Sequence, residues 1–342
     1  MKKLQNCLYI NRDGAYLHKE RETLIIDIKI EGKKQKLMQL PIHSIGHIFC
    51  FGNIMVSPQV MGFCGENGTG LAFFNQYGRF QARIVGKQSG NVLLRRAQYD
   101  ITDKQAAVLA RDIVAAKIRS SRGVLQRYAR NHSNSIDIQK SIDRHRQIIE
   151  ELPAHTDIEK IRGLEGEAAS HYFKVFDQLI TNSSNDIRFD GRNRRPPKDP
   201  INAMLSFLYA VQGNEISSAL QGVGLDPQVG FLHAERPGRD SLAQDLLEEF
   251  RAFFIDRLVL TLINRKQVSM KDFETDTLGG VSIKEDTRKA ILQAYQQKKQ
   301  EEIHHPFLNE KISIGLLPHI QAMLLARYIR GDIEHYPPFY QR

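Results

Sequence analysis

Residues 223–251 read VGLDPQVGFLHAERPGRDSLAQDLLEEFR. Glycine, proline and aspartate punctuate the first part of this stretch, which is the composition of a loop. Ser241 follows and is a good N-cap for the apolar, helical sequence LAQDLLEEFRAFFIDRLVLTLI that comes next. We therefore expect His233 to lie on an irregular loop that leads into a helix over residues 241–265.

Two carboxylates of this expected helix, Asp245 and Glu248, stand three residues apart and so project from one face. With the imidazole of His233 they form an oxygen and nitrogen donor set that suits Mg²⁺ or Mn²⁺. A structural role is the alternative. Asp245 could complement the helix dipole, Glu248 could pair with Arg251, and His233 could be a structural hydrogen-bonding residue.

A third candidate carboxylate, Glu165, lies in IRGLEGEAASHYFKVF, residues 161–176, among glycine, alanine and serine. Small residues around a carboxylate on a helix let a ligand or a second backbone approach closely. The alternative is close helix packing with a solvated Glu165. A metal site made with His233 and Glu248 would draw on one loop and two helices.

Basic side chains gather in two loops. The candidates for contact with DNA phosphates are Arg192, Arg194, Arg195, Lys198, Arg236 and Arg239. The first four crowd a Pro-Pro loop ahead of a helix expected near Pro200, and the other two bracket the Pro-Gly after His233. Guanidinium groups contact phosphate oxygens bidentately. A solvated basic turn is the alternative for the first loop, and ion pairs with Glu235 and Asp240 are the alternative for the second.

The chain from Leu4 to about Val85 has short β-like segments separated by Asp-Gly, Gly-Lys-Lys and Tyr-Gly turns. The segments are CLYI, AYLH, LIIDIKI, KLMQLPI, SIGHIFCF, GLAFFN and RFQARIV. One short helix is expected over residues 58–64. We predict a small β-sandwich, or a compact antiparallel β domain, over residues 1–86.

Helical periodicity begins at Thr102, after a polar stretch over residues 87–101 that we assign to a linker. Further helices are expected at residues 135–152, 157–182, 200–222, 241–265, 285–301 and 315–331. The second domain, residues 102–342, is therefore expected to be mainly α-helical. The predicted fold class is α+β, with a β domain followed by a larger helical catalytic domain.

The charge balance suits a polyanionic partner such as nucleic acid, because 48 Lys and Arg against 39 Asp and Glu give a net charge of +9. The three cysteines have no Cys-x-x-Cys spacing, which argues against a disulfide scaffold or a zinc ribbon. The N-terminus lacks the apolar run of a signal peptide, and no window reaches the roughly 18 apolar residues of a membrane span. We expect a soluble, cytoplasmic protein without a membrane partner.

Four segments together resemble CRISPR-associated protein one, the integrase of CRISPR adaptation. They are GLEGEAASHYF, RRPPKDPINAMLSFLYA, GLDPQVGFLHAERPGRDSLAQDLLEEFR and LLARYIRGDIEHYPPF. They follow the family's order and cover most of residues 160–339. The phrasing around His233 is most similar to the subtype I-C branch, and the β-then-helical organisation agrees with the family's two domains.

The resemblance implies a catalytic metal triad of Glu165, His233 and Glu248 holding Mg²⁺ or Mn²⁺. The last ligand is Asp in some members and Glu in others, so Glu248 is no serious departure. Asp245 matches an acidic position of the same motif and is expected to be a neighbour of the ligands.

The implied reaction is transesterification, in which the 3′-hydroxyl of a captured DNA fragment attacks a phosphodiester at the repeat boundary. The implied partners are double-stranded DNA, a second copy of the chain, and the small CRISPR-associated protein two, with which two dimers form a heterohexamer. A metal-dependent endonuclease without integration and a non-catalytic helical nucleic-acid-binding scaffold remain the alternative functions.

Overall fold

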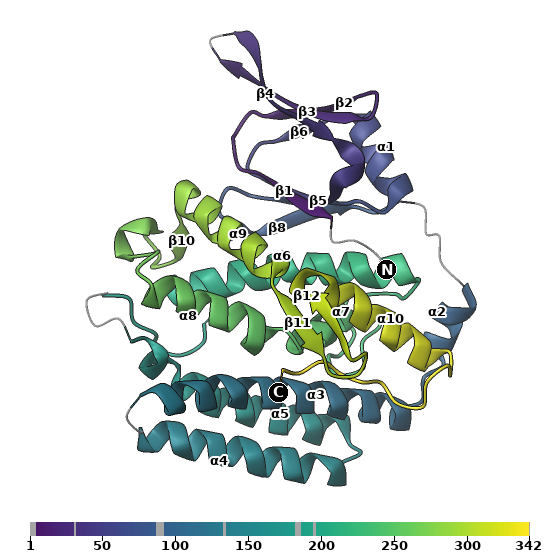
Figure 1. The fold of residues 1–342 in the computed structure, drawn as a ribbon, viewed down its shortest axis with the longest axis vertical. Helices are drawn as coiled ribbons and strands as arrows, with labels where there is room; N and C mark the ends of the chain where they lie inside the picture. The colour runs from purple at the N-terminus through teal and green to yellow at the C-terminus, as the bar shows by residue number, and fades with distance from the viewer. Residues whose placement is uncertain are drawn as a thin grey trace. The chain divides into compact units, whose positions relative to one another are not determined.

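The computed structural model describes residues 5–30, 32–86, 92–132, 135–181, 186–193 and 196–341 (Figure 1). The chain forms two compact units. The first comprises Met1–Ser89 and Ile283–Gln300, and the second comprises Gly90–Ser282 and Glu301–Arg342. Sheets dominate the first and helices the second, which confirms the α+β class.

The first unit contains two four-stranded sheets. One has the order β1-β5-β7-β8, formed by β1 (Asn6–Ile10), β5 (Ile45–Phe51), β7 (Gly70–Phe74) and β8 (Phe80–Ile84). The other has the order β4-β3-β2-β6, formed by β4 (Lys33–Pro41), β3 (Thr23–Ile30), β2 (Tyr16–Glu20) and β6 (Met55–Val56). A single hydrophobic cluster draws on both sheets and includes Ile10, Leu17, Leu24 and Ile48.

The pairing within these sheets is mixed, so the compact antiparallel domain that we considered is wrong. Strand β5 runs parallel to both β1 and β7, whereas β7 and β8 are antiparallel. Parallel neighbours need a crossover connection. Helix α1 (Pro58–Asn67) lies on the connection from β5 to β7, and its start is capped by Ser57, whose hydroxyl accepts from the backbone N–H of Val60.

Helix α9 (Glu285–Gln300) belongs to the first unit, although the sequence assigned these residues to the helical domain. The guanidinium of Arg288 lies over the ring of Phe51, 5.4 Å from its centroid. At the other end of the helix, Lys299 Nζ is 3.1 Å from Cys7 Sγ. These contacts join α9 to β5 and β1, a long-range association that helical periodicity cannot reveal.

The second unit holds most of the helices. They are α2 (Val92–Tyr99), α3 (Asp103–Asn131), α4 (Ile136–Glu151), α5 (Ile158–Lys174), α6 (Pro200–Val223), α7 (Ser241–Glu248), α8 (Arg257–Asn264) and α10 (Leu317–Ile329). Short hairpins follow, made of β9 (Phe273–Thr275) with β10 (Val281–Ile283) and of β11 (Glu302–His305) with β12 (Glu310–Ser313). Single 3₁₀ turns cover Leu152–Ala154, Phe176–Leu179, Met270–Asp272 and Ile314–Leu316, and a further one in the first unit covers Ile42–Ser44.

Helix α3 is the longest element, and α4 and α5 pack beside it (Figure 1). Its first residue follows a capping box, in which Thr102 and the Gln105 side chain exchange hydrogen bonds with each other's backbone. Helix α7 packs on α3 and on α6. The elements expected to carry the metal ligands, α5 and α7, therefore both contact α3.

Two expected elements differ in the structure. The expected helix over residues 241–265 is α7, a π-helical segment (Arg251–Asp256) and α8 in succession. The expected linker over residues 87–101 contains α2, which forms because Leu94 and Gln98 are four residues apart and both buried. No helix among the described residues is long and apolar enough to span a membrane.

Candidate metal centre

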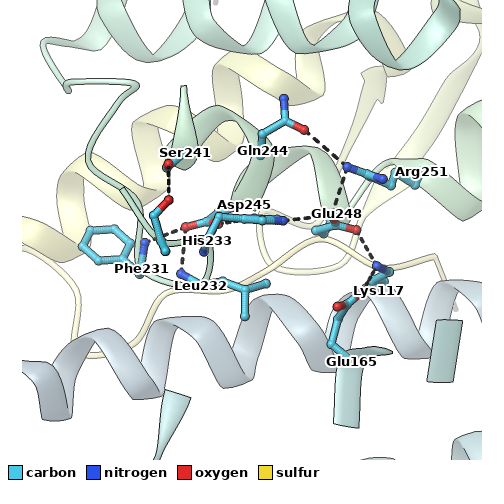
Figure 2. A network of polar contacts seen from close by, with 11 residues as sticks. Lys117, Glu165, Phe231, Leu232, His233, Ser241, Gln244, Asp245, Glu248 and Arg251 are labelled. Carbon is cyan, nitrogen blue, oxygen red and sulfur yellow. Dashed lines mark hydrogen bonds and ion pairs between the residues drawn. The ribbon is translucent and has the colours of Figure 1, made fainter. Parts of the chain in front are cut away.

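The loop that carries His233 is held by one buried carboxylate. Asp245, in α7, is fully buried, and it accepts backbone hydrogen bonds from Phe231 at 2.6 Å and from Leu232 and His233 at 2.9 Å (Figure 2). Donation to a carboxylate makes these bonds stronger than bonds between neutral groups. Asp245 thus fixes the backbone path immediately before and at His233.

Gly230 permits this approach of loop and helix. A Cβ at that position would lie 2.8 Å from the carbonyl carbon of Ser241 and 2.9 Å from Asp245 Oδ2. The Ser241 hydroxyl in turn donates to the carbonyl of Ala234 at 3.0 Å. This bond ties Ser241 to the loop. The sequence predicted Ser241 as the N-cap, but it is the first residue of α7, and Asp240 is the N-cap.

The imidazole of His233 is oriented by the same carboxylate. Its Nδ1 donates to Asp245 Oδ1 at 2.7 Å, and its Nε2 lies 3.8 Å from Glu248 Oε1. A carboxylate on one ring nitrogen is the usual way to fix a histidine that binds a metal through the other. Asp245 thus contacts His233 and orients its ring.

Glu248 is buried between positive groups. Its side chain is 3% exposed, with Oε2 at 2.7 Å from Lys117 Nζ and Oε1 at 3.1 Å from the Arg251 guanidinium. Burial raises the pKa of Glu248, but the charges of Arg251 and Lys117 outweigh burial and lower the pKa to about 2. The carboxylate is therefore charged at neutral pH.

Glu165, from α5, is linked to Glu248 by Lys117 of α3. The Lys117 ammonium contacts both the Glu165 carboxylate and Glu248, so it bridges carboxylates from two helices (Figure 2). Burial lowers the pKa of Lys117, and the charges of Glu248 and Glu165 raise it by more. The amine is therefore charged at neutral pH.

This arrangement fits a hard divalent ion by the chemistry of its donors. Two carboxylates and one imidazole nitrogen are typical oxygen and nitrogen ligands, and a cation already lies between the carboxylates in the form of the Lys117 ammonium. Among the described residues, no three acidic, histidine or cysteine side chains already form a closed metal cluster. Binding of an ion by Glu165 and Glu248 would require the ammonium to move aside.

The predicted phosphate-binding residues differ in exposure and in their contacts within the chain. Arg192 donates to the carbonyl of Asn193 at 2.7 Å, to Ser206 at 3.2 Å and to the Asn202 side chain, so its guanidinium is engaged within the chain. Lys198 and Arg236 are exposed, and Arg239 is half-buried. Arg194 and Arg195 lie outside the described residues. A role in DNA contact stays a prediction for all six.

Two residues that the sequence reasoning missed shape the site. Lys117 lies on the same face of α3 as Ala110, Ile113 and Val114, which are all fully buried. A lysine on an apolar helix face could have been recognised in the sequence as a candidate buried cation. Gln98 of α2 donates to the carbonyls of Asp226 and Val229 at 2.9 and 3.0 Å and thereby anchors the loop before His233. The sequence of α2 is polar and contains no motif, so the role of Gln98 could not be predicted from it.

Comparisons with known proteins agree with the resemblance. The family of CRISPR associated protein Cas1 matches residues 8–297. A protein named CRISPR-associated endonuclease Cas1 1, from Chlorobaculum tepidum, is 48% identical, and the match covers 100% of both chains. Two solved structures share the fold. A casposase bound to integration product matches with a TM-score of 0.83 at 22% identity, covering 98% of this chain and 94% of that one. A chain of a Cas6-RT-Cas1–Cas2 complex matches with a TM-score of 0.81 at 19% identity, covering 100% of this chain and 37% of that one.

Proposed function

The chain belongs to the Cas1 family of CRISPR-associated endonucleases, and from this membership we propose that it inserts short DNA fragments into a CRISPR array. The proposed chemistry is metal-dependent transesterification. The observation that supports the proposal is that the Lys117 ammonium contacts both Glu165 and Glu248, while His233 Nε2 lies 3.8 Å from Glu248 Oε1.

Glu165, Glu248 and His233 Nε2 would hold Mg²⁺ or Mn²⁺. When bound, such an ion polarises a phosphoryl oxygen and offsets the negative charge that develops on it. Asp245 keeps the ring of His233 oriented, and Arg251 keeps positive charge beside Glu248. A site with this arrangement suits the displacement of one oxygen of a phosphodiester by another.

In the proposed step, the 3′-hydroxyl oxygen of the captured fragment forms a bond to the phosphorus at the repeat boundary. The attacking hydroxyl gives up its proton, the bond from that phosphorus to its original 3′ oxygen breaks, and the leaving oxygen takes up a proton as a new 3′-hydroxyl. One phosphodiester replaces another, so the step needs no external energy source and runs in both directions. Water in place of the hydroxyl gives endonuclease cleavage.

The proposed partners are double-stranded DNA, a second copy of this chain, and CRISPR-associated protein two, with two dimers forming a heterohexamer in the cytoplasm. The net charge of +9 favours a polyanionic partner. The fold shared with a chain of the Cas6-RT-Cas1–Cas2 complex supports association with the second protein.

The test incubates the purified chain, with and without CRISPR-associated protein two, with a 3′-hydroxyl duplex and a supercoiled plasmid that carries the repeat. Joined products are expected with Mn²⁺, and none are expected with EDTA or with His233→Ala. Cleavage without joining would leave a metal-dependent endonuclease. Metal-independent DNA binding that Glu165→Ala does not alter would leave a nucleic-acid-binding scaffold.

A further inference from the structure

A cavity of about 390 Å³ opens in the second unit beside α3, α4 and the π-helical segment. Its walls include six arginines: Arg119, Arg122, Arg127, Arg130, Arg146 and Arg257. Tyr340 and Gln341, near the C-terminus, complete the lining, and Glu150 is its single carboxylate. We call this cavity the arginine pocket. Its volume is in the range of small-molecule binding sites.

Positive charge in the arginine pocket is poorly compensated within the described residues, where none of the six arginines forms an ion pair. The Nε of half-buried Arg122 has no hydrogen-bond partner there. Burial lowers the pKa of Arg257, and the charge of Arg127 lowers it further, whereas the charge of Glu301 partly opposes this shift. Six guanidinium groups held this close, with Glu150 as the single carboxylate in the lining, are unfavourable unless an anion joins them.

The pocket also offers apolar and planar surfaces. The guanidinium of Arg119 lies 4.9 Å from the ring centroid of Tyr340, and Phe253 and Ile149 form part of the wall. Arg257 donates to the side chain of Gln341 at 2.8 Å, which fixes it toward the chain end. A cavity that combines guanidinium forks with ring faces suits a phosphate group attached to a sugar and base.

The arginine pocket is separate from the metal centre. The residues that line it do not include Lys117, Glu165, His233 or Glu248. Lys117 faces Glu165 and Glu248. Helix α3 therefore contributes to the metal centre and to the arginine pocket through different residues.

We propose that the arginine pocket is a second anion site, which binds the phosphate groups of a nucleotide or of a single DNA strand independently of the metal triad. The phosphate chemistry is common to both sources. A free nucleotide would fill the cavity alone, whereas a strand would enter it with one or two of its phosphates.

The experiment measures binding by calorimetry in EDTA, with inorganic tripolyphosphate, adenosine triphosphate and a short oligothymidylate as probes. The test variant is Arg130→Gln with Arg146→Gln, two exposed residues of α3 and α4. The matched control is Arg96→Gln with Arg327→Gln, which removes two exposed charges elsewhere in the second unit. Arg122→Gln tests the inner wall, and circular dichroism checks that each variant folds.

We expect the test variant to weaken binding by about tenfold or more, because each guanidinium–phosphate bond is charge-assisted, while the control stays close to the unsubstituted protein. Weakening of all three probes identifies free phosphate compounds as ligands, and weakening of the oligothymidylate alone identifies a strand. Both outcomes support the site. Absence of binding by any probe, or equal loss in test and control variants, overturns it. Glu165→Gln is expected to keep the binding, so a failure of the catalytic proposal leaves this test intact.

Discussion

Asp245 receives hydrogen bonds from three backbone N–H groups and from the imidazole of His233, and it does so without exposure to water. A single buried carboxylate therefore defines both the loop and the direction of the ring. Replacing one of its oxygens by an amide nitrogen would place an N–H donor against the backbone N–H groups and the imidazole N–H that now donate to Asp245. The cost of such a change is local, because the packing around the residue keeps the same volume.

For Asp245→Asn we expect a loss of roughly 1–3 kcal/mol in the free energy of unfolding, since one or two buried N–H groups lose their acceptor. DNA joining should fall by about tenfold or more, because His233 loses its orienting partner. Urea titration and a joining assay measure the two effects. Asp177→Asn is the control, because Asp177 accepts the backbone N–H of Phe189 at 2.8 Å outside this loop. Equal effects of the two variants on joining would contradict the prediction.

Lys117 holds a cation against both carboxylates of the proposed triad, so it would compete with a metal for them. For Lys117→Met we expect Mn²⁺ to bind about tenfold more tightly, because the competing charge is gone. Titration calorimetry with Mn²⁺ measures the affinity without any DNA. Glu165→Gln, which removes a proposed ligand and keeps the lysine, should bind Mn²⁺ more weakly. Unchanged or weaker Mn²⁺ binding by Lys117→Met would refute the competition.

At the scale of elements, the start of α7 and the His233 loop touch at Gly230, where no side chain fits. Gly230→Ala should force the loop and the helix apart and destabilise the protein by about 1–3 kcal/mol. Denaturant unfolding gives the value. Gly222→Ala in α6 is the control, because nothing lies within 4 Å of a Cβ there and alanine favours a helix. A comparable loss in the control would contradict the assignment of the effect to the close contact at Gly230.

The C-terminal segment is tied to the end of α7 by Glu249, which is fully buried. Its carboxylate accepts hydrogen bonds from the Tyr336 hydroxyl at 2.6 Å, the Phe339 backbone at 2.7 Å and the Gln321 amide at 2.9 Å. Burial raises the pKa of Glu249 to about 8, against the smaller opposing effect of these bonds. At neutral pH the carboxyl group of Glu249 is therefore protonated in the folded protein and ionised in the unfolded chain.

Because the folded pKa of Glu249 lies above the unfolded value, its contribution to stability is complete below about pH 4.5 and is lost as the pH rises through about 8. We expect the free energy of unfolding to fall by about 1 kcal/mol per pH unit within this window. Glu249→Gln, which imitates the protonated acid, should remove this slope. Urea titrations from pH 5 to 8 measure it, with exposed Glu310→Gln as the control. A slope that persists in Glu249→Gln would assign it to another group.

Much of the fold at this scale could be predicted from the sequence. Period-two patterns and turn residues located seven of the strands, and apolar spacing located the long helices. The strand β6 has only two residues, and the break in the helix after Glu248 is a π-helical segment, so neither leaves a periodic signal. Glu165, His233 and Glu248 were predicted through motifs, whereas Lys117 acts through a contact between α3, α5 and α7 that exists only in the folded chain.

At the scale of the whole molecule, a net charge of +9 predicts that duplex binding depends steeply on salt. The logarithm of the affinity should fall linearly with the logarithm of the salt concentration, with a slope of about 0.9 per phosphate neutralised. Fluorescence anisotropy of a labelled duplex between low and physiological salt measures this slope. A flat response would mean that contacts other than phosphate contacts dominate the binding.

The chain passes from one compact unit to the other three times, because α9 returns to the sheets of the first unit before the sequence continues to the hairpin of β11 and β12. Neither unit is therefore formed by one continuous segment of the sequence. A fragment ending near residue 89 would leave the sheets without α9 and without the Arg288 contact to Phe51. A fragment starting at residue 90 would carry α9 with its apolar side chains deprived of their partner. Any attempt to express the halves separately has to splice residues 283–300 onto the first piece and close the resulting gap in the second.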